Sequence, residues 1–342
     1  MSLKNLSAKA KIHKLLINKL NNKKINQIYK KFEMTLFIKE SFIVSVSGGP
    51  DSLALAFLAK IYSLKHRVKS KFLIIDHKLR PNSTEEAKVV KQVLKKYLIN
   101  AEILTWKGKK PIKNIQAIAR KKRYDLLFAK CKELKINNVL LGHHQDDLFE
   151  NFFLRILRGS GLKGLVSLDR KSINNNNNLL RPLLNQKKED LVFLAKKIFN
   201  FYVEDPSNKD EKYQRIKIRN LIERLEKNGL DRKKFLNTIN NLKNSNNIVN
   251  FYVNENLRKN TFFNNKKKFL IINMQFFKEP YEVIFRSLSE SIKLVGKRYY
   301  NSRGKKIDKI IKDIESNTSF KGTLGGCIIE KVNQTVIISK EH

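Results

Sequence analysis

The sequence has few cysteines, few acidic residues and no long apolar run, and each shortage excludes a class of protein. Two cysteines in 342 residues exclude a disulfide-rich scaffold and are typical of a protein kept in a reducing cytosol. No apolar run reaches the roughly 18 residues that a membrane-spanning helix needs. The N-terminus lacks the apolar block and small-residue cleavage site of a secretory signal. We therefore expect a cytoplasmic protein without a membrane segment.

Acidic residues are scarce, because 31 Asp and Glu stand against 71 Lys and Arg, which gives a formal net charge of +40. A charge of this sign and size points to a polyanionic partner, most simply a nucleic acid. Of the basic residues, however, 55 are lysine and 16 are arginine, and asparagine and isoleucine are also abundant. A coding sequence biased toward A and T enriches all three without selection for binding. The position of the charges therefore has to decide what they do.

The apolar content is sufficient for a folded protein. Apolar residues make up 41% of the chain, which supports a buried core and argues against disorder. At roughly 150 residues per domain, the length predicts two domains or three small ones. We find no internal repeat.

Short apolar runs alternate with helical patterns along the first half of the chain. The predicted strands are 42–46, 72–75, 101–106 and 139–141, and the predicted helices are 53–61, 83–97, 114–134 and 145–157. The second of these helices opens with Ser83-Thr84-Glu85-Glu86, which is typical of a capping box. Such alternation predicts an α/β fold with a doubly wound, mostly parallel sheet.

Composition suggests further divisions. Residues 1–40 are rich in Lys and Asn and predict a basic, helical N-terminal extension. The α/β domain would then occupy 41–228. Residues 229–279 predict a helical linker, and 280–342 predict a small α+β C-terminal domain.

Two local features accompany this division. The asparagine run 174–178 predicts the tip of a loop. In the C-terminal domain, strand-like runs are expected at 323–329 and 335–339.

The strongest local motif is Ser47-Gly48-Gly49-Pro50-Asp51-Ser52, between the first predicted strand and the first predicted helix. Glycines let backbone amides approach a phosphate, the helix N-terminus adds partial positive charge, and the serine hydroxyls can donate to phosphate oxygens. The Gly-Lys-Ser/Thr of a Walker loop is missing. The string resembles the PP-loop of the N-type ATP pyrophosphatases, which have an adenine nucleotide alpha hydrolase-like fold and cleave ATP to AMP and pyrophosphate. The resemblance implies that these six residues bind ATP and that Asp51 helps to hold Mg²⁺.

Three further motifs follow predicted strands at their carboxyl ends, where ligands bind in open α/β sheets. We expect them to reach one site, although each could also have a purely structural role. Asp76 could cap a strand end, and cations on a helix are usually solvated. The motifs are Asp76-His77-Lys78-Leu79-Arg80 with Ser83 and Glu86; Asn114-Ile115-Gln116-Ala117 with Arg120, Arg123 and Tyr124; and Gly142-His143-His144-Gln145-Asp146-Asp147 with Glu150, Asn151 and Arg155.

The third of these motifs concentrates acid on a basic chain. At 100° per residue, Asp146, Glu150 and Asp147 fall at about 0°, 40° and 100° around the predicted helix. They therefore share one arc, beside His143. Carboxylates in a first helical turn also complement the helix dipole, but like charges this close repel unless a cation neutralises them. The pattern favours a site for a metal ion or an ammonium group.

Taken in order, these motifs resemble those of the tRNA(Ile)-lysidine synthetase family. The resemblance covers roughly residues 42–220 and includes Arg158 with the Gly-rich run after it, Arg181-Pro182-Leu183-Leu184, and Glu204-Asp205-Pro206-Ser207-Asn208 with Arg215 and Arg219. Gly322-Thr323-Leu324-Gly325-Gly326-Cys327 resembles part of the family's C-terminal tRNA-binding domain. The chain resembles the shorter form of the family, without a further C-terminal domain.

The resemblance implies a ligase that uses ATP and Mg²⁺. ATP would adenylate the C2 oxygen of the wobble cytidine in the CAU anticodon of tRNA(Ile), releasing pyrophosphate. Free L-lysine would then attack C2 and expel AMP, forming lysidine and switching the codon read from AUG to AUA. The tRNA, free lysine and ATP are thus the expected partners. A homodimer is a further expectation, and a membrane partner is not expected.

The resemblance also assigns roles to residues. Asp76 and His77 would join the PP-loop in binding ATP, and Asp146, Asp147 and Glu150 would bind lysine or the cytidine. Catalysis would involve Asp51, Arg120, Arg123, His143, Asp147 and Glu150. The tRNA would be contacted by Arg80, Arg155, Arg158, Arg181, Arg215 and Arg219.

Two other functions remain as alternatives. PP-loop tRNA sulfurtransferases share the loop but need a cysteine persulfide or a cluster, often with paired cysteines. Cys131 lies in a helical apolar run that predicts a core position, Cys327 is far away in the sequence, and no Cys-X-X-Cys is present. A non-enzymatic nucleic-acid binder would explain the charge, but it leaves the PP-loop-like string and the acidic arc without a role.

Overall fold

The structure is a computed structural model that describes residues 8–108, 115–204, 214–264, 269–296 and 304–341. The chain divides into two compact units, Met1–Leu230 and Asp231–His342, which we call unit 1 and unit 2. Of the motif residues named above, Asn114 and those at 205–208 lie outside the described residues.

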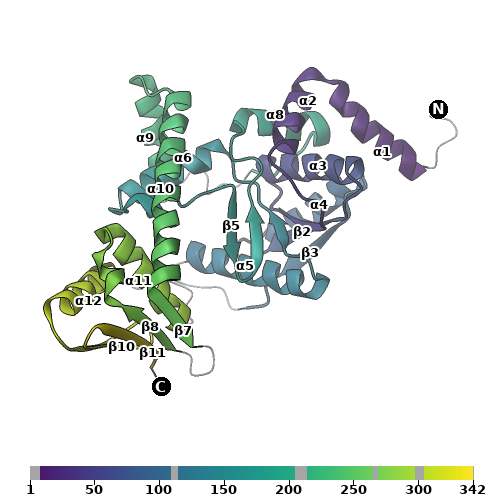
Figure 1. Cartoon of the computed structure of the whole chain (residues 1–342). Coiled ribbons are helices and arrows are strands. Elements are labelled where there is room, and N and C mark those ends of the chain that lie inside the picture. The colour runs from purple at the N-terminus through teal and green to yellow at the C-terminus, as the bar shows by residue number, and fades with distance from the viewer. Residues whose placement is uncertain (1–7, 109–114, 205–213, 265–268, 297–303, 342) are drawn as a thin grey trace. The chain divides into compact units, whose positions relative to one another are not determined.

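Unit 1 is built on a six-stranded sheet with the strand order β3-β2-β1-β4-β6-β5. Every neighbouring pair is parallel except β5 and β6. The strand order changes direction between the inner strands β1 and β4. The carboxyl ends of these two strands are therefore the switch point of the sheet. The prediction of a doubly wound, mostly parallel α/β sheet is confirmed (Figure 1). The strands are β1 (Phe42–Val46), β2 (Ser70–Asp76), β3 (Ala101–Thr105), β4 (Asn138–Leu140), β5 (Lys171–Asn174) and β6 (Asn177–Leu180).

Helices cover both faces of this sheet because strand side chains alternate between the faces. Phe42, Val44 and Val46 belong to one core cluster, which also contains the buried residues of α3 and α8. Ile43 belongs to a second cluster, with residues of α5. The helices that follow the strands are α3 (Pro50–Lys65), α4 (Ser83–Lys95), α5 (Ile115–Leu134), α6 (Gln145–Ile156), α7 (Leu162–Leu165), α8 (Lys188–Phe199) and α9 (Gln214–Lys227).

The N-terminal segment packs into unit 1. It contains α1 (Ala8–Asn18), the short 3-10 helix η2 (Lys19–Asn21) and α2 (Lys23–Glu33). Apolar side chains of α2 at helical spacing, including Ile25, Tyr29 and Phe32, are fully buried in the same core cluster as α3. The segment therefore contributes to the core of the α/β unit, whereas its composition suggested a separate basic extension.

The asparagine run is the turn of a β-hairpin. Asn175 and Asn176 have φ angles of 46° and 59°, and they join β5 to β6. Two residues with positive φ make the tight turn that connects antiparallel strands, and asparagine tolerates this conformation better than most residues. The expected loop tip is present, but the strands on either side of it were not predicted.

Unit 2 contains a long helix and a five-stranded antiparallel sheet. The sheet has the order β7-β8-β11-β10-β9 and packs against α11 and α12 through a core that includes Leu288, Ile292 and Ile311. The elements are α10 (Arg232–Asn260), β7 (Thr261–Asn264), β8 (Phe269–Asn273), η4 (Met274–Lys278), α11 (Tyr281–Gly296), α12 (Gly304–Ser316), β9 (Phe320–Leu324), β10 (Cys327–Val332) and β11 (Thr335–Lys340).

Two expectations for this part of the chain differ from the structure. The stretch expected to be a helical linker contains α10, but it also contains β7 and β8, which belong to the sheet of unit 2. The run 323–329, expected to be one strand, is split by a turn at Gly325 and Gly326, whose φ angles are 71° and 80°. Glycine adopts positive φ without a steric penalty, so the pair forms a hairpin turn between β9 and β10.

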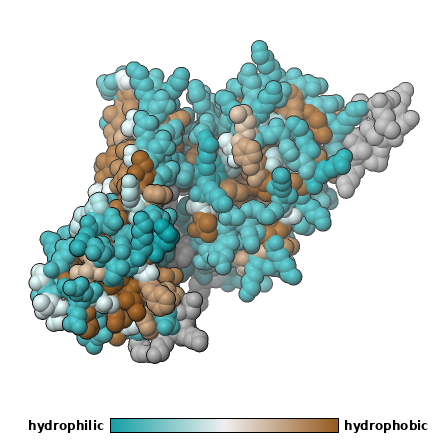
Figure 2. Space-filling model, viewed as in Figure 1, coloured by the Kyte–Doolittle hydropathy of each residue, from teal (hydrophilic) through white to brown (hydrophobic). Residues whose placement is uncertain are grey.

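Within the described residues, no helix combines the length and the apolar character that crossing a membrane requires. Hydrophilic residues cover most of the face that Figure 2 shows, in keeping with a chain in which 30% of the residues are charged.

Candidate active site

The PP-loop-like string forms the turn between β1 and α3. Gly48 has a φ of 90°, and a Cβ atom at this position would lie 2.6 Å from Val90 Cγ2, so only glycine fits there. Gly49 is the N-cap of α3 and Pro50 stands at its start. The first-turn amides of a helix have no partner within the helix. The turn therefore ends at a helix N-terminus, the arrangement that attracts phosphate.

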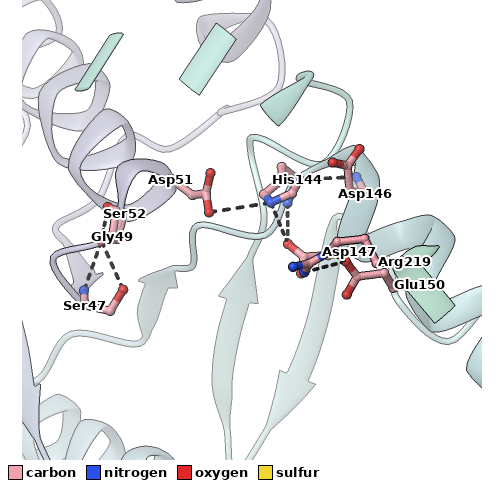
Figure 3. Close-up of polar contacts among 9 residues, drawn as sticks. All are labelled: Ser47, Gly49, Asp51, Ser52, His144, Asp146, Asp147, Glu150 and Arg219. Atoms are coloured by element: carbon pink, nitrogen blue, oxygen red, sulfur yellow. Dashed lines mark hydrogen bonds and ion pairs between the residues drawn. The ribbon is translucent and has the colours of Figure 1, made fainter. Parts of the chain in front are cut away.

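Ser52 organises this turn from inside. Its hydroxyl oxygen accepts from the amides of Ser47 and Gly48, both at 3.1 Å, and its hydroxyl donates to the carbonyl of Gly49 at 2.9 Å. Figure 3 shows the contacts with Ser47 and Gly49. The hydroxyl of Ser47 donates to the same oxygen at 3.2 Å. Both hydroxyls thus bond within the loop, and their ability to donate to phosphate stays a prediction.

Two close backbone approaches fasten the loop to the rest of unit 1. The amide of Val203 donates to the carbonyl of Gly48 at 2.9 Å. A Cβ atom on Gly142 would lie 3.4 Å from the carbonyl of Asp51 and from Cα of Ser52. Glycine at 142 therefore lets the turn after β4 lie against the start of α3, which brings His144 close to Asp51.

Asp51 lies in the first turn of α3 with one carboxylate oxygen available. Its Oδ2 is 3.5 Å from Nε2 of His144 (Figure 3). Its Oδ1 is buried and has no hydrogen-bond partner among the described residues. Mg²⁺ in nucleotide sites is commonly held by one or two carboxylates together with substrate phosphates, and Asp51 fits that requirement. The described residues contain no group of three His, Cys, Asp or Glu side chains placed to hold a metal ion by themselves.

His144 joins the PP-loop to the acidic helix, and sequence reasoning gave it no role. Its Nδ1 accepts from the amide of Asp146 at 3.2 Å, and its own amide donates to Oδ2 of Asp147 at 2.9 Å. This reciprocal pair caps α6. Nε2 then faces both Asp51 and Asp147, with each Oδ2 at 3.5 Å. The position directly before a helix that begins with acid was the available signal for such a cap.

The charges around His144 set its pKa. Burial by itself disfavours the imidazolium, but the hydrogen bond with Asp51 and the nearby charge of Asp147 outweigh burial and raise the pKa of His144. Burial likewise disfavours the ionised form of Asp147, yet His144 and His143 lower its pKa. The two sides of the site are thus electrostatically linked through one imidazole.

Glu150 is the most buried carboxylate of the acidic arc, with 2% of its surface exposed. Nε and Nη2 of Arg219 both donate to its Oε1, at 2.9 and 2.7 Å, while Oε2 is buried and has no partner among the described residues. Burial raises the pKa of Glu150, and Arg219 acts against that rise. The third acid, Asp146, is partly exposed and lies with Asp147 in the first turn of α6.

The expected arc of three carboxylates is therefore present, but the protein itself compensates much of its charge. His144 pairs with the carboxylate of Asp147, and Arg219 forms a salt bridge with Glu150. Among the described residues, the buried carboxylate oxygens of this site without a hydrogen-bond partner are Oδ1 of Asp51 and Oε2 of Glu150.

Two other histidines are held neutral. Burial lowers the pKa of His143 to about 3, although Asp147 opposes the shift. Burial and the charge of Arg123 lower the pKa of His77 to about 4. Arg123 Nε donates to His77 Nε2 at 3.4 Å, and the buried Nδ1 atoms of His77 and His143 have no partner among the described residues. Both imidazoles therefore stay neutral at pH 7, where one ring nitrogen can donate a hydrogen bond and the other can accept one.

Arg120 and Arg123 lie one turn apart on α5. Arg120 is exposed and stacks on the ring of Tyr124, with its guanidinium carbon 5.3 Å from the ring centroid. Its charge acts on His143, together with those of Arg181 and Arg215. Both predicted catalytic arginines therefore belong to the electrostatic surroundings of the site's histidines.

Asp76 is an anchor of the loop after β2. Its Oδ1 accepts from the amide of Lys78 at 3.0 Å and the hydroxyl of Ser83 at 2.9 Å, and its Oδ2 accepts from the hydroxyl of Thr84 at 2.7 Å. These bonds lower its pKa against the effect of burial.

The capping box expected at Ser83 is absent, because Asn82 is the N-cap of α4 and makes no side-chain bond. Glu86 instead pairs with Arg80, at 2.7 Å. The residues that looked like a helix cap thus fix the loop that carries His77.

The arginines assigned to tRNA fall into two groups. Arg181 is buried, and its Nη1 donates to the carbonyl of Asp169 at 2.8 Å and to Ser172 Oγ at 3.0 Å. Arg80 and Arg219 likewise make intramolecular contacts, with Glu86 and Glu150. Arg158 and Arg215 are exposed, and Arg155 is half-buried.

Comparison with known proteins identifies this arrangement. A family model described as a PP-loop domain matches residues 17–225. The tRNA(Ile)-lysidine synthase of Orientia tsutsugamushi is 35% identical over 313 residues, which cover 87% of this chain and 69% of that protein. The corresponding enzyme of Wolbachia pipientis is 32% identical, with 89% and 72% covered. The chain belongs to the tRNA(Ile)-lysidine synthase family of PP-loop enzymes. The family suggested by the motifs is thus confirmed, and the match includes α2.

A solved structure supports the fold of this tRNA(Ile)-lysidine synthase family member. The U34-tRNA thiolase of Methanococcus maripaludis, solved with its [4Fe-4S] cluster, has a TM-score of 0.56 and 17% identity, and the likeness covers 65% of this chain and 78% of that one. At this identity the likeness concerns the fold alone. In the present chain Cys131 and Cys327 are buried in different units and form no disulfide, and burial raises the pKa of Cys131 to about 11.

Proposed function

We propose that this protein joins free L-lysine to C2 of the wobble cytidine in the CAU anticodon of tRNA(Ile), using ATP and releasing pyrophosphate and AMP. One observation carries the proposal beyond the family name. Two buried carboxylate oxygens, Oδ1 of Asp51 beside the PP-loop and Oε2 of Glu150 in the acidic helix, lack partners among the described residues. A buried acceptor without a partner is costly unless a ligand completes it. The first lies where ATP would bind, and the second suits an ammonium group.

The first step is adenylation of the base. The C2 oxygen of the cytidine attacks the α-phosphorus of ATP, and the bond to the bridging oxygen of pyrophosphate breaks. A carbonyl oxygen of cytosine is a poor leaving group, and this step converts it into a good one, AMP. The N-terminus of α3 and the glycines of the loop bind the phosphates. Bound at Asp51, Mg²⁺ would supply positive charge next to the phosphates.

The second step is attack by lysine. Its ε-ammonium binds at the acidic side, with Glu150 and Asp147 as its carboxylate partners. It must lose a proton before the nitrogen attacks C2, and AMP then leaves with the former C2 oxygen. Burial lowers the pKa of His143 to about 3, so this neutral imidazole is too weak a base to keep that proton and can only relay it to water. Arg120 and Arg123 offset negative charge on the adenylyl group.

The tRNA is bound outside this chemistry. Arg155, Arg158 and Arg215 are the arginines of the motifs that remain at least partly exposed, and they suit contacts with phosphate. We assign catalysis to unit 1 and further tRNA binding to unit 2. Work on a tRNA, together with two buried free thiols, fits a protein of the cytoplasm.

The proposal is tested by incubating the full chain with ATP, labelled L-lysine and tRNA transcripts. Label is expected in an isoleucine tRNA with a CAU anticodon, with one AMP and one pyrophosphate released per lysine. A methionine tRNA with the same anticodon is the matched control and should stay unlabelled. A folded protein that binds ATP but labels neither tRNA contradicts the proposal.

A further inference from the structure

We infer that Arg219 is a positioning residue for lysine: it holds the Glu150 carboxylate so that one oxygen, Oε2, is presented to the incoming ammonium. The inference rests on the proposed function and deepens it. The motif alone suggested a tRNA contact for Arg219, and the geometry points elsewhere.

The two side chains form a directed pair. Nε and Nη2 of Arg219 converge on the same oxygen, Oε1, at 2.9 and 2.7 Å. A carboxylate can accept about four hydrogen bonds, two at each oxygen. Arg219 therefore uses one oxygen only, and it leaves Oε2 buried without a partner among the described residues. The planar guanidinium fixes the rotation of the carboxylate in a way that a flexible ammonium could not.

Burial explains why the pair is needed. Glu150 is 2% exposed, whereas the side chain of Arg219 is 32% exposed. A carboxylate this buried tends to take up a proton, and a protonated Glu150 would not attract an ammonium group. The charged groups that face Glu150 are Arg219 and Arg215, which favour its ionised form, and Asp147, which opposes it. Arg219 is the one that also makes hydrogen bonds to it.

Packing of helices delivers Arg219 to this position. Arg219 is on α9, Glu150 is on α6, and the two helices pack together within unit 1. Ile216, Ile218 and Ile222 are the buried residues of α9. Arg219 lies between them in sequence, so the packing that buries the isoleucines also sets the guanidinium against Glu150.

Lysine kinetics of variants test the inference. Arg219→Gln should lower kcat/KM for lysine roughly 10- to 100-fold, mainly by raising KM, because the carboxylate loses its orientation and its counter-charge. The acid limb of the pH profile should move to higher pH. Arg219→Lys should lie between the wild type and Arg219→Gln, since it restores the charge without the planar fork. Tests on tRNA affinity use Lys217→Gln as the matched control, because Lys217 is an exposed cation on the same helix.

A double-variant cycle separates positioning from general damage. In a Glu150→Gln background, Arg219→Gln should change kcat/KM for lysine by less than about twofold, because the partner through which it acts is already lost. The dissociation constant for tRNA should change no more in Arg219→Gln than in Lys217→Gln. If Arg219→Gln fails to fold, the intermediate KM of Arg219→Lys remains the deciding value.

Three outcomes overturn the inference alone. The first is an unchanged KM for lysine in a folded Arg219→Gln, and the second is weaker tRNA binding by Arg219→Gln than by Lys217→Gln. The third is that the effects of Arg219→Gln and Glu150→Gln on kcat/KM for lysine are additive. Failure of the wild type to incorporate lysine at all is a different result. It overturns the proposed function, and the inference falls with it.

Discussion

The PP-loop and the start of α6 lie next to each other, but they satisfy their polar groups in different ways. Inside the loop, Ser52 bonds only to residues no more than five positions away. The acidic helix depends on a distant cation, because Arg219 is 69 positions from Glu150. Within the part of the chain that the structure describes, each side has one buried carboxylate oxygen without a hydrogen-bond partner. A nucleotide site can therefore be read from one short string, whereas the neighbouring acidic site exists only after the helices have packed.

The largest effect is expected on the loop side, from Asp51→Ala. Removing this carboxylate takes away the open oxygen beside the phosphates and one partner of His144. We expect tRNA-dependent release of pyrophosphate to fall on the order of 100- to 1,000-fold, as for loss of a preorganised electrostatic contact. Radiolabelled ATP measures it. Pyrophosphate release by Asp51→Ala at the wild-type rate would contradict the assignment of this step to the PP-loop side of the site.

Ser52→Ala should have a smaller effect of a different kind. The hydroxyl bonds to Ser47, Gly48 and Gly49, so its loss loosens the loop without removing a charged group. We expect KM for ATP to rise roughly tenfold, with less change in kcat. Ser47→Ala removes one hydroxyl contact to the same oxygen and serves as the milder control. An equal rise in KM for ATP in Ser52→Ala and Ser47→Ala would contradict the conclusion that the Ser52 hydroxyl organises the loop.

Acid should weaken the fold through His143, because its pKa of about 3 in the folded protein lies below its unfolded value near 6.5. Below pH 6.5 the unfolded chain binds more protons. The free energy of unfolding should therefore fall by up to about 1.4 kcal/mol per pH unit for this group, down to its folded pKa.

Denaturant unfolding at several pH values measures this slope. His143→Gln should make the slope between pH 6.5 and pH 4 shallower. His144→Gln should leave that slope nearly unchanged, because the raised pKa of His144 gives a stabilisation that is complete below the unfolded value near 6.5 and is lost only as pH rises through the folded pKa. If the free energy of unfolding depends on pH in the same way in both variants, the opposite pKa shifts of His143 and His144 are contradicted.

The smallest effect is expected from the cysteines. Cys131 and Cys327 are buried in two different cores. The double variant Cys131→Ala with Cys327→Ala should modify tRNA within about twofold of the wild-type rate, with only the stability loss of small core cavities. Loss of turnover in a folded double variant would favour sulfur transfer instead.

Sequence patterns anticipated those parts of the molecule that local chemistry determines. Strands β1 to β4 and the helices after them were expected because apolar runs and glycine turns alternate. The β5–β6 hairpin was missed because its turn is made of asparagines, which also indicate an unstructured loop. The contacts of His144 with Asp51 and of Arg219 with Glu150 were not predicted, because helix capping and the packing of α9 on α6 depend on contacts that no single motif displays.

The central claim is that ATP is handled at the PP-loop and lysine at the acidic helix. Glu150→Gln tests it most directly when both half-reactions are measured on the same preparation. We predict that tRNA-dependent pyrophosphate release stays within about threefold of the wild type, while lysine incorporation falls roughly 100-fold, because the neutral amide cannot bind the ammonium as a carboxylate does. Equal loss of both half-reactions, or normal incorporation of lysine, would contradict the account.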